Sequence, residues 1–266
     1  MSSHNHSLHS KLSIGGLLVT LGIIYGDIGT SPLYVMKAIL GVHEISRDIV
    51  LGGISCVFWT LTLQTTIKYV IITLSADNHG EGGIFALFAL VKRTKIKWLI
   101  IPAIIGGSAL LADGIITPPI SVSAAVEGIN TFYAMETQTI QIIVICILFV
   151  LFTIQQFGSK LVGKFFAPMM LIWFSMLGIL GTLQVLNDFS VFNAINPYYA
   201  YELLLIHPEG FFVLGAVFIC TNGAEALYSD MGHCGRKNIR ISWIFVKIAL
   251  ILNYFGQGAY LIHNVG

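Results

Sequence analysis

The sequence predicts an all-α polytopic membrane protein, and two observations carry this prediction. Hydrophobic residues make up 56% of the 266 residues and charged residues only 10%, against roughly 25% charged residues in a soluble domain. The apolar residues gather in seven stretches, each long enough to cross a hydrocarbon core that is about 30 Å thick and needs about 20 helical residues. A transmembrane β-barrel would instead require short segments of alternating polar and apolar residues, which the sequence lacks.

Each of the seven stretches has the properties of a membrane-spanning helix. The first is not a cleavable signal, because Asp27 interrupts it and no small-residue cleavage site follows. The third contains one charged residue, Asp113, and the fourth and fifth contain none. The stretches cover residues 14–40, 49–75, 98–126, 138–157, 165–187, 211–229 and 241–262.

The basic residues predict the orientation, because cytoplasmic loops collect Lys and Arg. If the spans alternate, ten basic residues face one side and only two, Lys37 and Arg47, face the other. The N-terminus is therefore expected in the cytoplasm, and a chain that ends after its seventh span indicates the front part of a longer protein. We expect a cytoplasmic tail at 1–13, five spans at 14–187, an extracytoplasmic loop at 188–210 and two further spans at 211–266. The ten residues are Lys11, Lys92, Arg93, Lys95, Lys97, Lys160, Lys164, Arg236, Lys237 and Arg240.

Charge and motifs argue against several classes of function. The formal net charge is only +1, so no nucleic-acid partner is expected. The four cysteines show no CxxC spacing, and neither a zinc site nor a disulfide is expected. An enzyme is not expected either, because no nucleophile–base pair appears and the GEGG run at 80–83 lacks the Lys and Ser or Thr of a phosphate-binding loop.

The first and sixth spans are expected to be broken near their middles. In the first, Pro32 removes a backbone N–H close to Asp27, and in the sixth Gly223 lies beside Glu225. Unwound backbone at membrane depth is tolerated only beside protein or a watery cavity. Breaks in spans one and six fit a five-helix repeat whose second copy is inverted. Half-helix ends and freed carbonyls would then coordinate a substrate or ion.

The third span contributes a polar face. Asp113, Thr117 and Ser121 are four residues apart, so at about 100° per residue they lie within roughly 80° of one another on a helix. Pro118 and Pro119 are expected to bend the helix there.

Three intramembrane carboxylates, Asp27, Asp113 and Glu225, indicate a functional site, because each costs about 2.5–3.5 kcal/mol to insert. With Tyr34 and the third-span hydroxyls they offer only oxygen ligands, which suits a hard monovalent cation. The hydroxyl groups and Tyr34 also have a purely structural interpretation. Ser and Thr hydroxyls often bond to their own helix, and Tyr34 has the character of an interfacial aromatic. Two further intramembrane charges, Lys68 and Lys247, are expected to extend to the membrane surface.

Five segments form an ordered set of motifs: GDIGTSPLY at 26–34, DNHGEGGIFAL at 77–87, DGIITP at 113–118, NPYYA at 196–200 and GAEALYSDMGH at 223–233. This set resembles the KUP/HAK/KT potassium uptake family, with matches in order from residue 14 to about 260. The resemblance implies a potassium:proton symporter that works by alternating access, in the plasma membrane, which in a bacterium is the inner membrane.

The resemblance also implies the amino acid–polyamine–organocation (LeuT-like) inverted-repeat fold, here truncated after the seventh transmembrane helix. The expected partners are the lipid bilayer, potassium, protons and a second copy in a homodimer. No cofactor is expected besides the substrate ions.

Carried over by motif, the implied potassium ligands are Asp27, Tyr34, Asp113, Thr117, Ser121 and Glu225. Where the family usually has Thr-Gly-Ala-Glu, this chain has Asn222-Gly223-Ala224-Glu225 with Thr221 one place earlier, so Thr221 and Asn222 are both candidates. Three carboxylates around one cavity repel one another, and at least one is expected to exchange a proton for potassium. Asp113 and Glu225 are the expected proton carriers, because freed backbone groups can stabilise the charge of Asp27.

Two other functions fit parts of the pattern. An amino-acid or other small-solute permease of the same fold would devote Gly-rich N–H groups in its first break to a substrate carboxylate, whereas this break holds Asp27. A seven-helix retinal-type photoreceptor or pump would use Lys247 for its Schiff base and Asp113 as counter-ion. Its N-terminus would lie outside the cell, opposite to the charge distribution here.

Overall fold

The computed structural model describes residues 12–41, 45–93, 96–130, 132–155, 159–206 and 210–264, and the regular elements in these ranges are helical. Six helices are long and apolar enough to cross a membrane, and a bent helix pair at the N-terminus makes up to seven. The protein is therefore a polytopic helical membrane protein. Most of the tail expected at 1–13, including Lys11, and the basic residue Lys95 lie outside the described residues. The six helices are Arg47–Ser75, Ile100–Asn130, Thr137–Ile154, Phe166–Val185, Phe212–Ser229 and Arg236–His263.

The first span is broken as predicted, and the structure locates the bend. Residues Ile14–Ile24 and Gly26–Leu33 meet at an angle of 69°. The bend falls at Tyr25, whose fully buried side chain stacks on Trp243 and donates a hydrogen bond of 3.0 Å to the carbonyl of Ile239. The span therefore consists of four short pieces, α1 (Ile14–Ile24), α2 (Gly26–Thr30), η1 (Ser31–Leu33) and α3 (Val35–Leu40).

The sixth span is also broken. It comprises α10 (Gly210–Phe218), η6 (Ile219–Thr221), a run of turn residues at 222–225 and α11 (Ala226–Ser229). The turn contains Gly223 at φ +81°, a backbone conformation that glycine adopts without steric cost. A further short helix, α12 (Met231–Cys234), ends at Gly235 and leads into α13 (Arg236–His263).

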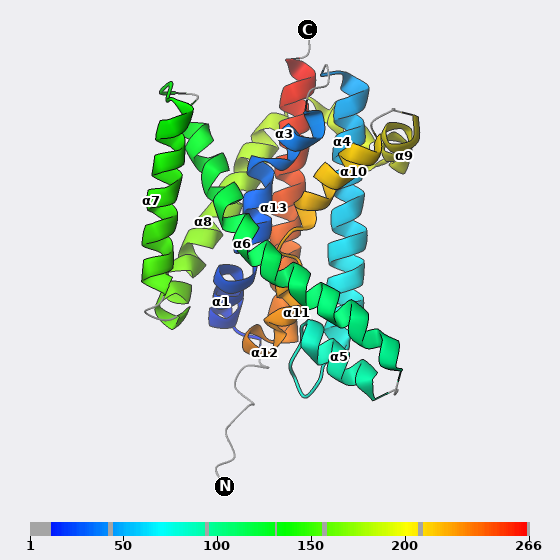
Figure 1. Cartoon of the computed structure of the whole chain (residues 1–266). Coiled ribbons are helices and arrows are strands. Elements are labelled where there is room, and N and C mark those ends of the chain that lie inside the picture. The colour runs from blue at the N-terminus through cyan, green and yellow to red at the C-terminus, as the bar shows by residue number, and fades with distance from the viewer. Residues whose placement is uncertain are drawn as a thin grey trace.

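The third span is one continuous helix, α6 (Ile100–Asn130), which runs through Pro118 and Pro119 without a break. It crosses the front of the bundle diagonally in Figure 1 and packs against α7 (Thr137–Gln155). Only 6% of the most apolar window of each of these two helices is buried, so both present wide apolar surfaces.

Helix α13 runs through the centre of the bundle in Figure 1, and α8 (Ser159–Val185) packs along it. The two helices approach closely at glycines, since a Cβ on Gly256 would lie 2.6 Å from the Cα of Gly181. Small residues allow this backbone contact between membrane helices. The second span completes the core with α4 (Arg47–Thr60), the π-helical η2 (Leu61–Ile72) and η3 (Thr73–Ser75).

Segments expected to be loops contain short helices. The segment 188–210 holds η5 (Phe189–Ile195) and α9 (Pro197–Ile206), and the connection after the second span holds α5 (Ile84–Lys92) and η4 (Lys97–Leu99). Helix α9 packs on α4, where a Cβ on Gly52 would lie 2.7 Å from the Cβ of Leu203. These helices are too short to span a bilayer, so they were not predicted from a criterion that required about 20 apolar residues.

Candidate functional site

Three segments that are distant in the sequence bring three carboxylates together. Asp27 lies on α2, Asp113 on α6, and Glu225 at the end of the break before α11. One carboxylate oxygen from each residue lies within 4.8 Å of the other two, and all three side chains are partly buried. The two helix breaks therefore converge on the polar face of α6.

Hydrogen bonds link two of these carboxylates through Asn222 and Thr117. The amide nitrogen of Asn222 donates to Asp27 Oδ2 over 3.3 Å and to Thr117 Oγ1 over 2.9 Å. Thr117 Oγ1 in turn donates to Asp113 Oδ1 over 2.9 Å. A single chain of hydrogen bonds thus connects the first break, the sixth break and α6.

The other carboxylate oxygen of Asp27, Oδ1, is buried and has no hydrogen-bond partner among the described residues. A buried carboxylate oxygen without a donor is costly, and such atoms are found at functional sites. The chemical complement of this oxygen is a cation, which fits the all-oxygen character of the cluster.

Gly223 allows the two breaks to touch. A Cβ at this position would lie 2.6 Å from the Cβ of Asp27 and 2.9 Å from its Oδ2, and the backbone has a positive φ. Both conditions require glycine, so this residue places the sixth break directly against Asp27.

Ser121 and Tyr34 contact first-span residues that follow Asp27. Thr30 Oγ1 donates to the Asp27 carbonyl over 2.8 Å, so Ser121 is the donor in its 3.0 Å hydrogen bond with Thr30. The hydroxyl of Tyr34 lies 3.5 Å from Ser31 Oγ.

Thr221 and Asn222 are the two candidate ligands in the sixth break, and of these Asn222 is the one whose side chain contacts Asp27 and Thr117. The hydroxyl of Thr221 is directed back along its own helix and donates to the carbonyl of Phe218 over 2.9 Å. The Asn222 side chain, one residue later, reaches Asp27 and Thr117.

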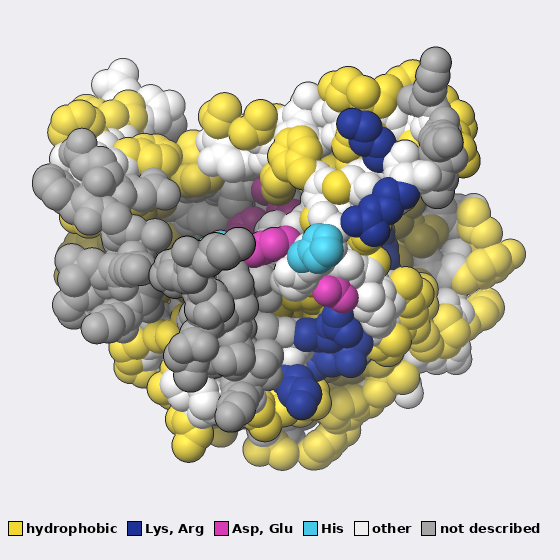
Figure 2. Space-filling model, turned by 90° about the horizontal axis from the view of Figure 1, so that it is seen from below, with side chains coloured by type: hydrophobic (Ala, Val, Ile, Leu, Met, Phe, Trp, Pro, Cys, Tyr) yellow, Lys and Arg dark blue, Asp and Glu magenta, His cyan; other side chains and the backbone are white. Residues whose placement is uncertain are grey.

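Two cavities flank the cluster along α6. A cavity of about 530 Å³ is lined by Asp113, Asn222 and Glu225 together with residues of α5, α11 and η2. Acidic side chains are visible in a hollow of the lower face in Figure 2. Further along α6, a cavity of about 510 Å³ is lined by Tyr34, with Lys37 and Glu127, whose side chains form an ion pair of 2.8 Å.

Lys68 also lines the larger cavity, and it is an exposed residue, so the structure does not contradict the prediction that it extends to the membrane surface. Its ammonium lies 5.0 Å from the ring centroid of Tyr69. Lys68 belongs to the π-helical segment η2, and π-helical turns are frequent at functional sites. Sequence periodicity does not distinguish a π-helix from an α-helix, so the sequence predicted an ordinary membrane helix here.

The fold and the site together define a polytopic helical membrane protein with a cluster of three carboxylates where two broken helices meet. The chain belongs to the family described as K+ potassium transporter integral membrane domain, which matches residues 14–266. The sequence-based recognition of this family is confirmed.

Curated relatives agree with the family. The chain is 80% identical to "Probable potassium transport system protein Kup" of Flavobacterium johnsoniae, 77% identical to the protein of that name in Flavobacterium psychrophilum and 54% identical to the one in Enterococcus faecalis. These matches cover 100%, 100% and 95% of this chain and 41%, 40% and 39% of the relatives, so the chain spans about two-fifths of their length. No solved structure is significantly similar to it.

Proposed function

We propose that this chain takes part in potassium uptake across the plasma membrane, which in a bacterial cell is the inner membrane. The observation that carries the proposal is the convergence of oxygens from Asp27, Asp113 and Glu225 within 4.8 Å at the meeting point of two helix breaks. Side-chain oxygens of this kind replace the hydration shell of a hard monovalent cation. The name of the relatives, a probable potassium transport system protein, selects potassium among such cations.

In this proposal the ligands are side-chain oxygens. The three carboxylates supply the charge, and hydroxyls complete the set. Asn222 joins them by turning its amide so that the oxygen replaces the nitrogen that now contacts Asp27. Thr221 is not needed, since its hydroxyl is bonded to Phe218. The proposed hydroxyl ligands are Tyr34, Thr117 and Ser121.

We assign proton coupling to Asp113 and Glu225. Three carboxylates this close repel one another unless a cation or a proton offsets their charge. Asp113 and Glu225 line the larger cavity, whereas Asp27 Oδ2 is held by Asn222. A proton that leaves Asp113 or Glu225 therefore has a route through this cavity, which supports potassium:proton symport.

The wider architecture in this proposal is the LeuT-like inverted repeat, with a cytoplasmic N-terminus, alternating access and a homodimeric state. The breaks in the first and sixth spans, five spans apart, support the inverted repeat. Alternating access would rock the two repeats around the carboxylate cluster, exposing first the smaller and then the larger cavity.

The test is rubidium uptake by a chimera in which this chain replaces the matching 267-residue segment of the Flavobacterium johnsoniae relative. In cells without other potassium importers, we expect uptake that falls when the proton gradient is collapsed. Asp113→Asn and Glu225→Gln should flatten the pH dependence of uptake while some cation binding remains, and the exposed Glu136→Gln should not. Full pH dependence and proton-driven accumulation in both variants would place the coupling elsewhere.

A further inference from the structure

The first break frees backbone carbonyls, but two of them are already bonded to side chains from other helices. The Gly29 carbonyl accepts a hydrogen bond of 2.8 Å from the indole N–H of Trp173 on α8. The Pro32 carbonyl accepts one of 3.0 Å from the amide of Gln257 on α13. These carbonyls therefore fasten the break to the protein, and each uses one of its two acceptor positions to do so. The sequence-based expectation that freed carbonyls coordinate the ion stays a prediction.

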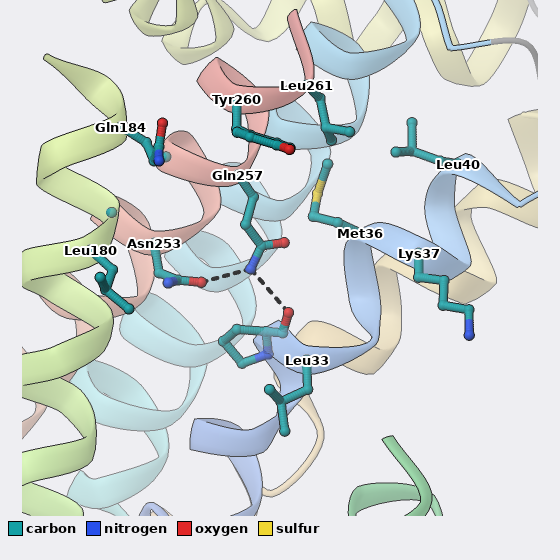
Figure 3. Close-up of a pocket in the computed structure, with 13 residues that line it drawn as sticks. Leu33, Met36, Lys37, Leu40, Leu180, Gln184, Asn253, Gln257, Tyr260 and Leu261 are labelled. Atoms are coloured by element: carbon teal, nitrogen blue, oxygen red, sulfur yellow. Dashed lines mark hydrogen bonds between the residues drawn. The ribbon is translucent and has the colours of Figure 1, made fainter. Parts of the chain in front are cut away.

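The two donors stand on helices that are themselves joined. Asn253 on α13 donates to the Leu177 carbonyl of α8 over 3.3 Å and accepts from Gln257 over 2.7 Å. Both hydrogen bonds of Gln257 are drawn in Figure 3. With the close glycine contact between α8 and α13 described above, the two helices form a rigid support behind the break. We call Trp173, Asn253 and Gln257 the clamp.

The clamp acts close to two of the proposed ligands. Gly29 is two residues after Asp27, and Pro32 is two residues before Tyr34. Side chains of α8 also press on Gly29, where a Cβ would lie 2.8 Å from Phe174. The segment that carries Asp27 and Tyr34 is thus fixed from one side by hydrogen bonds and packing, while Gly223 contacts it from the other.

We propose that Trp173 and Gln257 are positioning residues that set the spacing of the oxygen ligands and so the selectivity among monovalent cations. The proposal rests on the proposed potassium function. Selectivity among such ions depends on the number of ligands and on how firmly their spacing is held. Loosening the clamp therefore weakens binding of the preferred ion more than that of its competitors.

The test compares Trp173→Phe and Gln257→Leu with two matched controls in the same chimera. Trp59→Phe removes an equivalent indole bond, of 3.1 Å to the Ile195 carbonyl, away from the cluster. Gln184→Leu removes a glutamine that lines the same 420 Å³ pocket as Gln257 and is bonded instead to Asn187.

Loss of the hydrogen bond that either side chain donates to the break should raise the KM for rubidium about 2- to 12-fold, with little change in maximal rate. Gln257→Leu also removes the hydrogen bond to Asn253. Inhibition of rubidium uptake by sodium and caesium should become stronger in both clamp variants and stay unchanged in the controls. Unchanged KM and selectivity, or equal effects in the controls, would overturn the proposal.

Hydrogen exchange over residues 26–34 provides a readout that does not depend on transport. We expect faster exchange in both clamp variants and no change in the controls, and unchanged exchange in the clamp variants would overturn the clamp. Absence of rubidium uptake by the unaltered chimera would contradict the proposed function instead, and the exchange result would still decide the clamp.

Discussion

Oδ2 of Asp27 accepts a hydrogen bond from Asn222, whereas Oδ1 has no hydrogen-bond partner among the described residues. Asp27→Asn keeps the size of the side chain but removes the charge that faces the cation in the proposed site. We expect it to abolish rubidium uptake by the chimera, with normal membrane insertion on immunoblots. Asp48→Asn, at an exposed carboxylate in the first turn of α4, is the matched control and should leave uptake unchanged. Unchanged uptake in Asp27→Asn would remove this residue from the site.

A substitution at Gly223 tests whether the contact between the two helix breaks is required for uptake. Gly223→Ala forces a side chain into left-handed backbone, at about 1–2 kcal/mol, and directs its Cβ at Asp27. We expect a lower unfolding temperature and loss of uptake. Gly215→Ala is the control, because a Cβ there meets no atom within 4 Å. If both variants behave alike, the close approach at Gly223 has no role in the site.

Among the elements, the loop at 76–83 connects η3 to α5 and packs against the end of the sixth span. A Cβ on Gly82 would overlap the Tyr228 carbonyl, and Tyr228 OH donates to the Ala76 carbonyl, so the loop lies directly on α11. Asp77 Oδ1 forms an ion pair of 2.7 Å with Arg236 at the start of α13. The loop therefore ties the second, sixth and seventh spans together beside the larger cavity.

The pKa of Asp77 should reveal what holds this loop. The backbone N–H of Gly80 lowers the pKa of this carboxyl below its ordinary value, and the Arg236 guanidinium lowers it further through its charge and its hydrogen bond. The ionised form therefore stabilises the folded loop above an ordinary Asp pKa of about 3.9, and this contribution is lost as the pH falls through the lower folded pKa. Arg236→Gln should raise the pKa only part of the way, because the Gly80 bond remains.

A carboxyl NMR titration of Asp77 measures this shift, and Lys237→Gln, the adjacent exposed cation, is the control. The accompanying loss of stability should stay below about 1 kcal/mol, because the ion pair is exposed. A pKa that returns fully to the ordinary value in Arg236→Gln would show that the ion pair, and not the Gly80 N–H, is the main cause.

At the scale of the whole molecule, the basic residues predict the orientation in the membrane. Lys and Arg side chains gather on the lower face in Figure 2, and Arg236 begins α13 at that end. The opposite end of α13 meets η5, since a Cβ on Gly258 would lie 3.3 Å from Val191. Lys237 and Asn193 therefore mark opposite sides of the bundle.

Impermeant thiol labelling tests this orientation in a Cys146→Ser background, because Cys146 is exposed and the other three cysteines are buried. Asn193→Cys should be labelled from outside intact cells, and Lys237→Cys only after the membrane is permeabilised. The reverse pattern would place the N-terminus outside the cell.

Local chemistry accounts for what the sequence alone determined. Long apolar stretches specify membrane helices whatever their neighbours are. Gly or Pro near a carboxylate indicated the breaks in the first and sixth spans, although α6 stays continuous through Gly114, Pro118 and Pro119 after Asp113. The spans, both breaks and the carboxylates Asp27, Asp113 and Glu225 were therefore predictable, and the structure brings these carboxylates together.

Tertiary structure decided the features that depend on what approaches from a distant segment. The first span bends at Tyr25 because its side chain is buried against α13, and Asn222 joins the cluster because the turn around Gly223 directs it there and leaves Thr221 on its own helix. The carbonyl of Gly29 is bonded because Trp173 arrives from α8. Such contacts are absent from local patterns, because they arise only when helices far apart in the sequence pack against one another.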